Sequence, residues 1–83
     1  MAHLQATTKA QIITFLQTHK VAVVDCYATW CGPCKMIAPY VDSKNKETGI
    51  ALIKVDVDQS AELSSLFKIE AMPTFLAIKL EGN

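Results

Sequence analysis

Arginine is absent from this 83-residue chain, and all eight of its basic residues are lysine. Eight acidic residues balance them, so the formal net charge at pH 7 is zero. Nucleic-acid-binding domains usually carry a basic stripe rich in arginine, because the planar guanidinium pairs well with phosphate. The composition therefore predicts no nucleic-acid partner. The missing arginines also argue against a mitochondrial presequence.

Long apolar runs are missing as well. No segment approaches the roughly 20 consecutive apolar residues that a membrane-spanning helix requires, and the N-terminal segment has no apolar core of the secretory-signal type. We therefore expect no membrane partner. Cysteine occurs only three times, which is too few, and an odd number, for the disulfide scaffold of a small secreted protein. These absences predict a soluble protein of the cytoplasm, where thiols are kept reduced.

Hydrophobic residues make up 51% of the chain, enough for the core of one small domain that spans residues 1–83. Apolar, β-branched runs predict strands at 21–28, 50–57 and 73–80, with a weaker strand signal at 3–6. Helical spacing of apolar residues is found between these runs, at 7–20, 35–47 and 59–67. Strands that alternate with helices predict an α/β layered sheet.

The second predicted helix should present Met36, Ile37, Tyr40 and Val41 on one apolar face. Its polar end, residues 42–49, lacks an apolar anchor, so we expect a short or frayed last turn.

The third predicted helix should turn Leu63, Leu66 and Phe67 inward, with Asp58 or Ser60 as its N-cap. Asp56 and Asp58 lie two residues apart and could form an acid/base carboxylate pair. A strand end that leads into a helix cap is the interpretation we favour for them.

The most informative motif is Cys31-Gly32-Pro33-Cys34, at the joint between a predicted strand and a predicted helix. A structural metal site needs about four ligands, usually in two pairs, whereas this chain has one such pair and two isolated histidines. An inert thiol pair at the joint is a second interpretation. The third interpretation is a redox-active dithiol, and local physics favours it.

A helix N-terminus presents unpaired N–H groups and the positive end of the helix dipole, which stabilise a thiolate. Cys31 should therefore be the exposed nucleophile, and Cys34, one turn later, lies close enough to close a disulfide with it. Pro33 fits the first helical turn, where its missing N–H costs nothing. Gly32 lets another backbone approach closely. The motif predicts a dithiol switch.

The chain resembles the thioredoxin family in four motifs, which occur in order between residues 21 and 79: "VVD", "TWCGPCKMIAP", "VDVD" and "AMPT". The resemblance implies a thioredoxin-like α/β fold, with a central mixed sheet and helices on both faces. It also implies reduction of protein disulfides through a reversible Cys31–Cys34 disulfide, without a cofactor or a metal. The family's last strand and C-terminal helix have no counterpart in this sequence.

By the same resemblance, Cys31 attacks the substrate disulfide and Cys34 resolves the mixed disulfide. Asp25 matches a buried carboxylate that relays the Cys34 proton; the alternative for this residue is a strand end that faces solvent. Lys54 matches a lysine beside that carboxylate, with an ordinary exposed lysine as the alternative.

The resemblance also implies a substrate groove beside the two cysteines. Trp30, Gly32 and Pro33 match one of its walls. Met72 and Pro73 match the other wall, where the family has a cis proline. Trp30 could instead be a core aromatic residue.

Cys26 stands where the family usually has a large apolar side chain. We interpret it as a small buried hydrophobic residue, with a regulatory thiol as the alternative.

The expected partners follow from the resemblance. They are proteins with accessible disulfides and an NADPH-dependent thioredoxin reductase, in a role in electron transport and cell redox homeostasis. The alternative function is a truncated protein-binding module with incidental redox activity. In the family layout without its last strand, the strand predicted at 73–80 becomes an apolar sheet edge. The sequence therefore also predicts self-association, through edge pairing or exchange of elements, or else a marginal monomer that opens readily.

Overall fold

The computed structural model describes residues 2–81. Its strands are β1 (His3–Gln5), β2 (Val21–Tyr27), β3 (Ala51–Asp56) and β4 (Thr74–Lys79). Its helices are α1 (Lys9–His19), α2 (Gly32–Thr48) and α3 (Ala61–Leu66). Each element predicted from the sequence is present, in the predicted order.

The four strands form one mixed sheet in the order β1-β3-β2-β4. β1, β3 and β2 run parallel, and β4 pairs antiparallel with β2. β2 thus lies between β3 and β4, and Asp25 is in register with Lys54 on one side and with Phe75 on the other. In the described part of the chain, β4 is an edge of the sheet.

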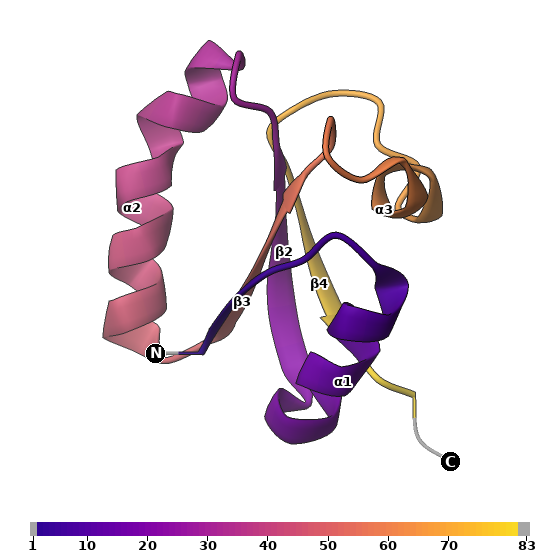
Figure 1. The fold of residues 1–83 in the computed structure, drawn as a ribbon. Coiled ribbons are helices and arrows are strands. Elements are labelled where there is room, and N and C mark those ends of the chain that lie inside the picture. Colours follow the sequence, from indigo (N-terminus) through magenta and orange to yellow (C-terminus); the bar gives the residue numbers. More distant parts are fainter. Residues whose placement is uncertain (1, 82–83) are drawn as a thin grey trace.

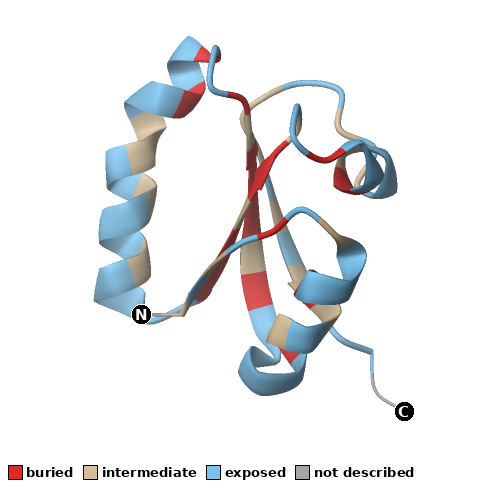
Figure 2. Ribbon diagram, viewed as in Figure 1, coloured by how far each residue is buried: buried red, intermediate tan, exposed pale blue. Residues whose placement is uncertain are grey.

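The helices cover the two faces of the sheet unequally. α1 and α3 lie on one face, and α2 lies on the other (Figure 1). Buried residues follow β2 and β3, whereas most of α2 is exposed (Figure 2). The main core lies under α1 and α3, and its members include Ile12, Leu16, Val24, Ile53 and Leu63. The predicted α/β fold with helices on both faces is therefore confirmed.

The last turn of α2 corrects one prediction. The helix is not short or frayed: it runs to Thr48 and ends at Gly49, whose φ of 73° is a left-handed conformation that suits glycine. The side-chain amide of Asn45 donates hydrogen bonds to the carbonyl oxygens of Ala2 and Ile50. These polar contacts hold the helix end in place of the apolar anchor that the sequence lacks.

Two predictions of burial were also wrong. On α2, Met36 is 83% exposed and Tyr40 is 61% exposed, because this helix is the only one on its face of the described sheet. Ile37 and Val41, predicted on the same helix face, are half-buried. Leu66, expected to face inward, is exposed because α3 ends there after a single buried residue, Leu63. Ser60, not Asp58, is the N-cap of α3.

Candidate functional site

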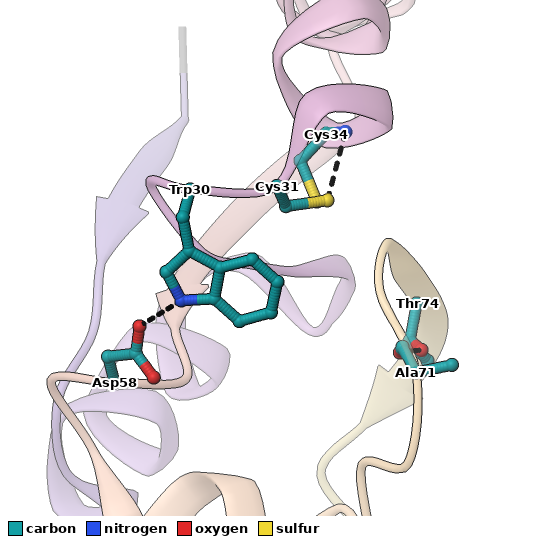
Figure 3. The surroundings of a disulfide bond; sticks show 6 residues. All are labelled: Trp30, Cys31, Cys34, Asp58, Ala71 and Thr74. Atoms are coloured by element: carbon teal, nitrogen blue, oxygen red, sulfur yellow. Dashed lines mark hydrogen bonds between the residues drawn. A yellow bond between two sulfur atoms is a disulfide. The ribbon is translucent and has the colours of Figure 1, made fainter.

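A disulfide joins Cys31 and Cys34 at the N-terminus of α2, with their Cα atoms 5.3 Å apart (Figure 3). The chain leaves β2, passes through the loop 28–30, and enters the helix with Cys31 as N-cap. The backbone N–H of Cys31 donates to the carbonyl of Ala28 at 3.1 Å, which fixes the loop. Pro33 lies in the first helical turn, as predicted. The motif thus lies where the chain passes from the end of β2 to the start of α2.

The sulfur of Cys31 takes the place that a Ser or Asp oxygen usually has in a helix cap. The backbone N–H of Cys34 donates to Cys31 Sγ at 3.2 Å. Once the disulfide is reduced, the same N–H and the positive end of the helix dipole stabilise negative charge on this sulfur. Cys31 is therefore the cysteine that the geometry favours as thiolate.

The exposure of Cys31 differs from the prediction. In this disulfide-bonded form Cys31 is only 5% exposed and Cys34 only 6% exposed. Apolar side chains pack against the pair and Ala28; they are Tyr27, Val57 and Met72. Gly32 and Pro33, between the two cysteines, remain exposed. Access to the pair is thus through the Gly-Pro turn and the neighbouring surface.

Trp30 lies beside the disulfide and is 66% exposed, so it is not a core aromatic residue. Its indole N–H donates to the carboxylate of Asp58 at 2.7 Å (Figure 3). Asp58 is held in turn, because its backbone N–H donates to the carboxylate of Asp56 at 2.9 Å. The two aspartates thus have separate hydrogen-bonding roles, neither of them as the predicted helix cap. Sequence reasoning missed the Trp30–Asp58 pair, since no local signal links residues 28 positions apart.

The second predicted wall is the turn before β4. Figure 3 shows this turn, at Ala71 and Thr74, across from the disulfide. The hydroxyl of Thr74 donates to the carbonyl of Ala71. The peptide bond between Met72 and Pro73 is cis, as expected, and Met72 packs against the disulfide cluster. The structure therefore brings both predicted walls to the cysteine pair; their roles in binding stay predictions.

A pocket of about 350 Å³ lies beside Cys34. It reaches Cys34 from the side of α2 and Asp25 from the sheet. Asp25 is 4% exposed, so the alternative of a solvent-facing strand end is excluded. Burial raises the pKa of the Asp25 carboxyl, the Lys54 charge lowers it in part, and the Asp42 charge raises it further. Asp25 and Cys34 thus line one pocket, and the role of Asp25 as a proton relay stays a prediction.

Lys54 is not an ordinary exposed lysine. Its side chain is only 16% exposed, and its Nζ lies 3.0 Å from Oδ1 of Asp42 on α2. It lines the same pocket as Asp25. Sequence reasoning missed Asp42, although its position two helical turns after Cys34 along α2 could have indicated it.

Cys26 is fully buried in the main core, on the face opposite to Asp25. Burial, with a smaller effect of the Asp25 charge, raises the pKa of its thiol to about 11. Cys26 therefore stays a protonated, small hydrophobic residue at neutral pH, which agrees with our interpretation and not with a regulatory thiol.

Residues 2–81 offer neither a metal site nor a membrane span. No group of three or more His, Cys, Asp or Glu side chains in this range is arranged to hold a metal ion. Over the same residues, no helix has the length and apolar character needed to cross a membrane.

Known proteins resemble this chain in sequence over most of its length. The Thioredoxin family model matches residues 3–83. A Thioredoxin H-type from rice (Oryza sativa subsp. indica) is 44% identical over 71 residues, which are 84% of this chain and 58% of the rice protein. This chain therefore spans little more than half the length of that relative.

Solved structures give a similar result. The reduced Schistosoma mansoni thioredoxin pre-protein superimposes with a TM-score of 0.85 at 40% identity, over 95% of this chain and 77% of that one. A second match comes from the structural study of thiol resolution in yeast mitochondrial 1-Cys peroxiredoxin via glutathione and thioredoxin systems. That chain superimposes with a TM-score of 0.82 at 30% identity, over 95% of this chain and 74% of that one.

Proposed function

The chain belongs to the thioredoxin family, and on that premise we propose that it is a dithiol-disulfide oxidoreductase that reduces disulfides in other proteins. The observation that carries this proposal is the Cys31–Cys34 disulfide at the N-terminus of α2, with Cys31 Sγ as acceptor of the Cys34 N–H. A pair that can close a disulfide can hold two electrons when it is open. The reaction therefore needs no bound cofactor.

The reaction proceeds in two exchanges. The Cys31 thiolate attacks one sulfur of the substrate disulfide, forms a mixed disulfide and releases the first substrate thiolate. Cys34 then loses its proton to Asp25, through water in the pocket behind it, and attacks the Cys31 sulfur. This second exchange releases the other substrate thiolate and leaves Cys31–Cys34 oxidised. Two electrons have then passed from the protein to the substrate.

The substrate should lie across the exposed Gly-Pro turn, between Trp30 and the Met72–Pro73 turn. Gly32 is exposed, and a Cβ added to it would meet no atom within 4 Å, so this side is open to a substrate backbone. Trp30 offers a large apolar surface beside the disulfide. A protein substrate with an accessible disulfide fits this surface.

Regeneration requires an electron donor, and we propose an NADPH-dependent thioredoxin reductase in the cytoplasm. The similarity to a chain studied in yeast peroxiredoxin thiol resolution supports a place in thiol-exchange systems. Coupling to a reductase is a separate property from the chemistry of the cysteine pair, so it needs its own test.

A protein-binding module with incidental redox activity is the second candidate. The observation that favours it is β4, an edge of the described sheet with Phe75 and Ala77 exposed on the face that it shares with α2. Unpaired backbone groups along an apolar edge can pair with another chain, including a second copy of this one.

Insulin reduction separates the two candidates. The assay uses dithiothreitol as donor first, and then NADPH with thioredoxin reductase. We expect turnover with the first donor, and with the second if the reductase docks. A double variant, Cys31→Ser with Cys34→Ser, is the control for background reduction. A wild-type rate equal to that of the double variant would refute the oxidoreductase and leave the binding module.

A further inference from the structure

The ion pair between Asp42 and Lys54 connects α2 to the pocket that holds Asp25. We propose that Asp42 is a positioning residue: it fixes where the Lys54 ammonium lies relative to Asp25, and so sets the pH range in which Asp25 accepts the proton of Cys34. The link to catalysis rests on the proposed function; the effect on Asp25 itself does not.

The geometry places the three side chains on one side of the sheet. Asp25 and Lys54 are in register on neighbouring parallel strands, so their side chains leave the sheet on the same face. α2 covers that face (Figure 1). Asp42 follows Cys34 and Ala38 at four-residue intervals along α2, and Cys34 and Ala38 both line the pocket. The helix that carries the resolving cysteine, Cys34, thus also carries the anchor of Lys54.

The contact with Asp42 restricts the position of the Lys54 ammonium. The four-carbon stem of lysine is flexible, and its ammonium can move toward either of two carboxylates. Lys54 is mostly buried, and its Nζ lies 3.0 Å from Asp42 Oδ1. An ammonium held by Asp42 is shared with Asp42, so it stabilises the Asp25 carboxylate less than a free one would.

The two members of the ion pair act on Asp25 in opposite directions. Burial has the largest effect on the pKa of the Asp25 carboxyl and raises it; Lys54 lowers this pKa, while Asp42 raises it. Loss of Asp42 removes a negative charge and also frees Lys54 to interact with Asp25, and both consequences lower the pKa of the Asp25 carboxyl. Loss of Lys54 raises that pKa.

The remaining groups around Asp25 do not replace this pair. The other titratable side chains that line the pocket are His3 on β1, Tyr27 on β2, and Cys34 and Lys35 on α2. On the β4 side, the register partner of Asp25 is Phe75, which carries no charge. Among the described residues, the ion pairs are Lys44–Glu47 and Lys54–Asp42, so Asp42–Lys54 is the charged contact to vary at this pocket.

The experiment compares Asp42→Asn, Lys54→Gln and the double variant. Glu47→Gln is the matched control, because it removes the same charge from the same helix, where Glu47 pairs at 2.8 Å with exposed Lys44 outside this pocket. Carbon-13 NMR follows the titration of the Asp25 carboxyl in the oxidised protein, which needs no activity. Rapid-mixing kinetics with a disulfide peptide then give the pH dependence of mixed-disulfide resolution.

We expect Asp42→Asn to move the Asp25 titration to lower pH by about half a pH unit, and Lys54→Gln to move it to higher pH by about half a pH unit or more. The rising limb of the resolution rate should move in the same two directions. In the Lys54→Gln background, Asp42→Asn should have less effect than alone, since only its own charge is then lost. Glu47→Gln should move neither curve.

Shifts of the same sign in the two single variants, or an Asp42→Asn shift no larger than that of Glu47→Gln, would overturn the proposal. A titration that moves as expected in a protein that reduces no disulfide at any pH would support the positioning by Asp42 and refute the oxidoreductase. The two failures are therefore distinguishable.

Discussion

The indole N–H of Trp30 donates to the carboxylate of Asp58 at 2.7 Å, and this bond joins the loop before the disulfide to the loop after β3. Trp30 is 66% exposed, so packing alone does not orient its ring. The hydrogen bond supplies that orientation, and the backbone N–H of Asp58, bonded to Asp56, holds the acceptor. An aromatic surface is thereby kept beside the reactive cysteines.

Substitution of Asp58 by alanine should release the indole. We expect KM for a protein disulfide to rise about two- to fivefold and the free energy of unfolding to change by less than ~1 kcal/mol, since the bond is exposed. Fluorescence anisotropy reports the ring directly, because Trp30 is the only tryptophan. Asp58→Asn keeps an acceptor oxygen and is the control. An anisotropy unchanged in Asp58→Ala would contradict the orienting role.

The order of the two cysteines can be tested by trapping. Cys34→Ser should accumulate a mixed disulfide between Cys31 and a disulfide peptide, because the resolving thiol is gone. Cys31→Ser should form no such adduct and reduce nothing. Mass spectrometry after acid quenching measures both. An adduct in Cys31→Ser but not in Cys34→Ser would reverse the assignment of the nucleophile.

Asp25→Asn should slow the resolving step roughly tenfold or more near neutral pH, because the base that accepts the Cys34 proton is lost. The rate of the wild-type protein should rise with pH as the Asp25 carboxyl ionises, at a pH raised by burial. The variant should lack this limb. Rapid-mixing kinetics across the pH range provide the comparison, and an identical profile in both proteins would leave Asp25 with a structural role alone.

The same substitution should stabilise the fold at neutral pH. Burial holds the pKa of folded Asp25 above its ordinary value of 3.8, which applies to the unfolded chain. The contribution of Asp25 to stability is therefore complete below that value and is lost as pH rises through the folded pKa. The asparagine side chain cannot ionise, so Asp25→Asn should melt higher than the wild type at about pH 8, with a smaller difference at about pH 4. Thermal unfolding at both pH values tests the sign, and a difference that grows toward low pH would contradict it.

Phe75→Lys should weaken self-association of the 83-residue chain through β4. Phe75 is 40% exposed on the edge strand, where a charge disfavours pairing with another copy. We expect the dissociation constant to rise roughly tenfold or more, which is ~1.4 kcal/mol. Light scattering across a dilution series measures it. Leu66→Lys on α3, 44% exposed on the other face, is the control; a wild-type protein that is monomeric at every concentration would refute the association.

The sequence alone was sufficient for the order of elements and for the chemistry of the motif. β-branched runs, helical spacing and the Cys31-Gly32-Pro33-Cys34 tetrad are local patterns, and local propensity decides them. The burial of Asp25 could also be predicted, because its neighbours on β2 are apolar. Which faces of α2 and α3 are buried could not be predicted. Amphipathic spacing places Met36 and Leu66 on an apolar helix face, but it does not show whether another element covers that face.

Tertiary structure decided which distant residues surround the cysteines. Asp58 meets Trp30 across 28 residues, and no local pattern links the two. The position of Asp42 on α2 indicates only that it shares a helix face with Cys34; its contact with Lys54 on β3 depends on how the helix lies on the sheet. Tertiary packing also buried Cys31, which its helix-terminal position had suggested would be exposed. Contacts of this kind require the two atoms to lie about 3 Å apart, so they depend on where the chain brings two side chains, and only the folded sheet with its helices fixes that.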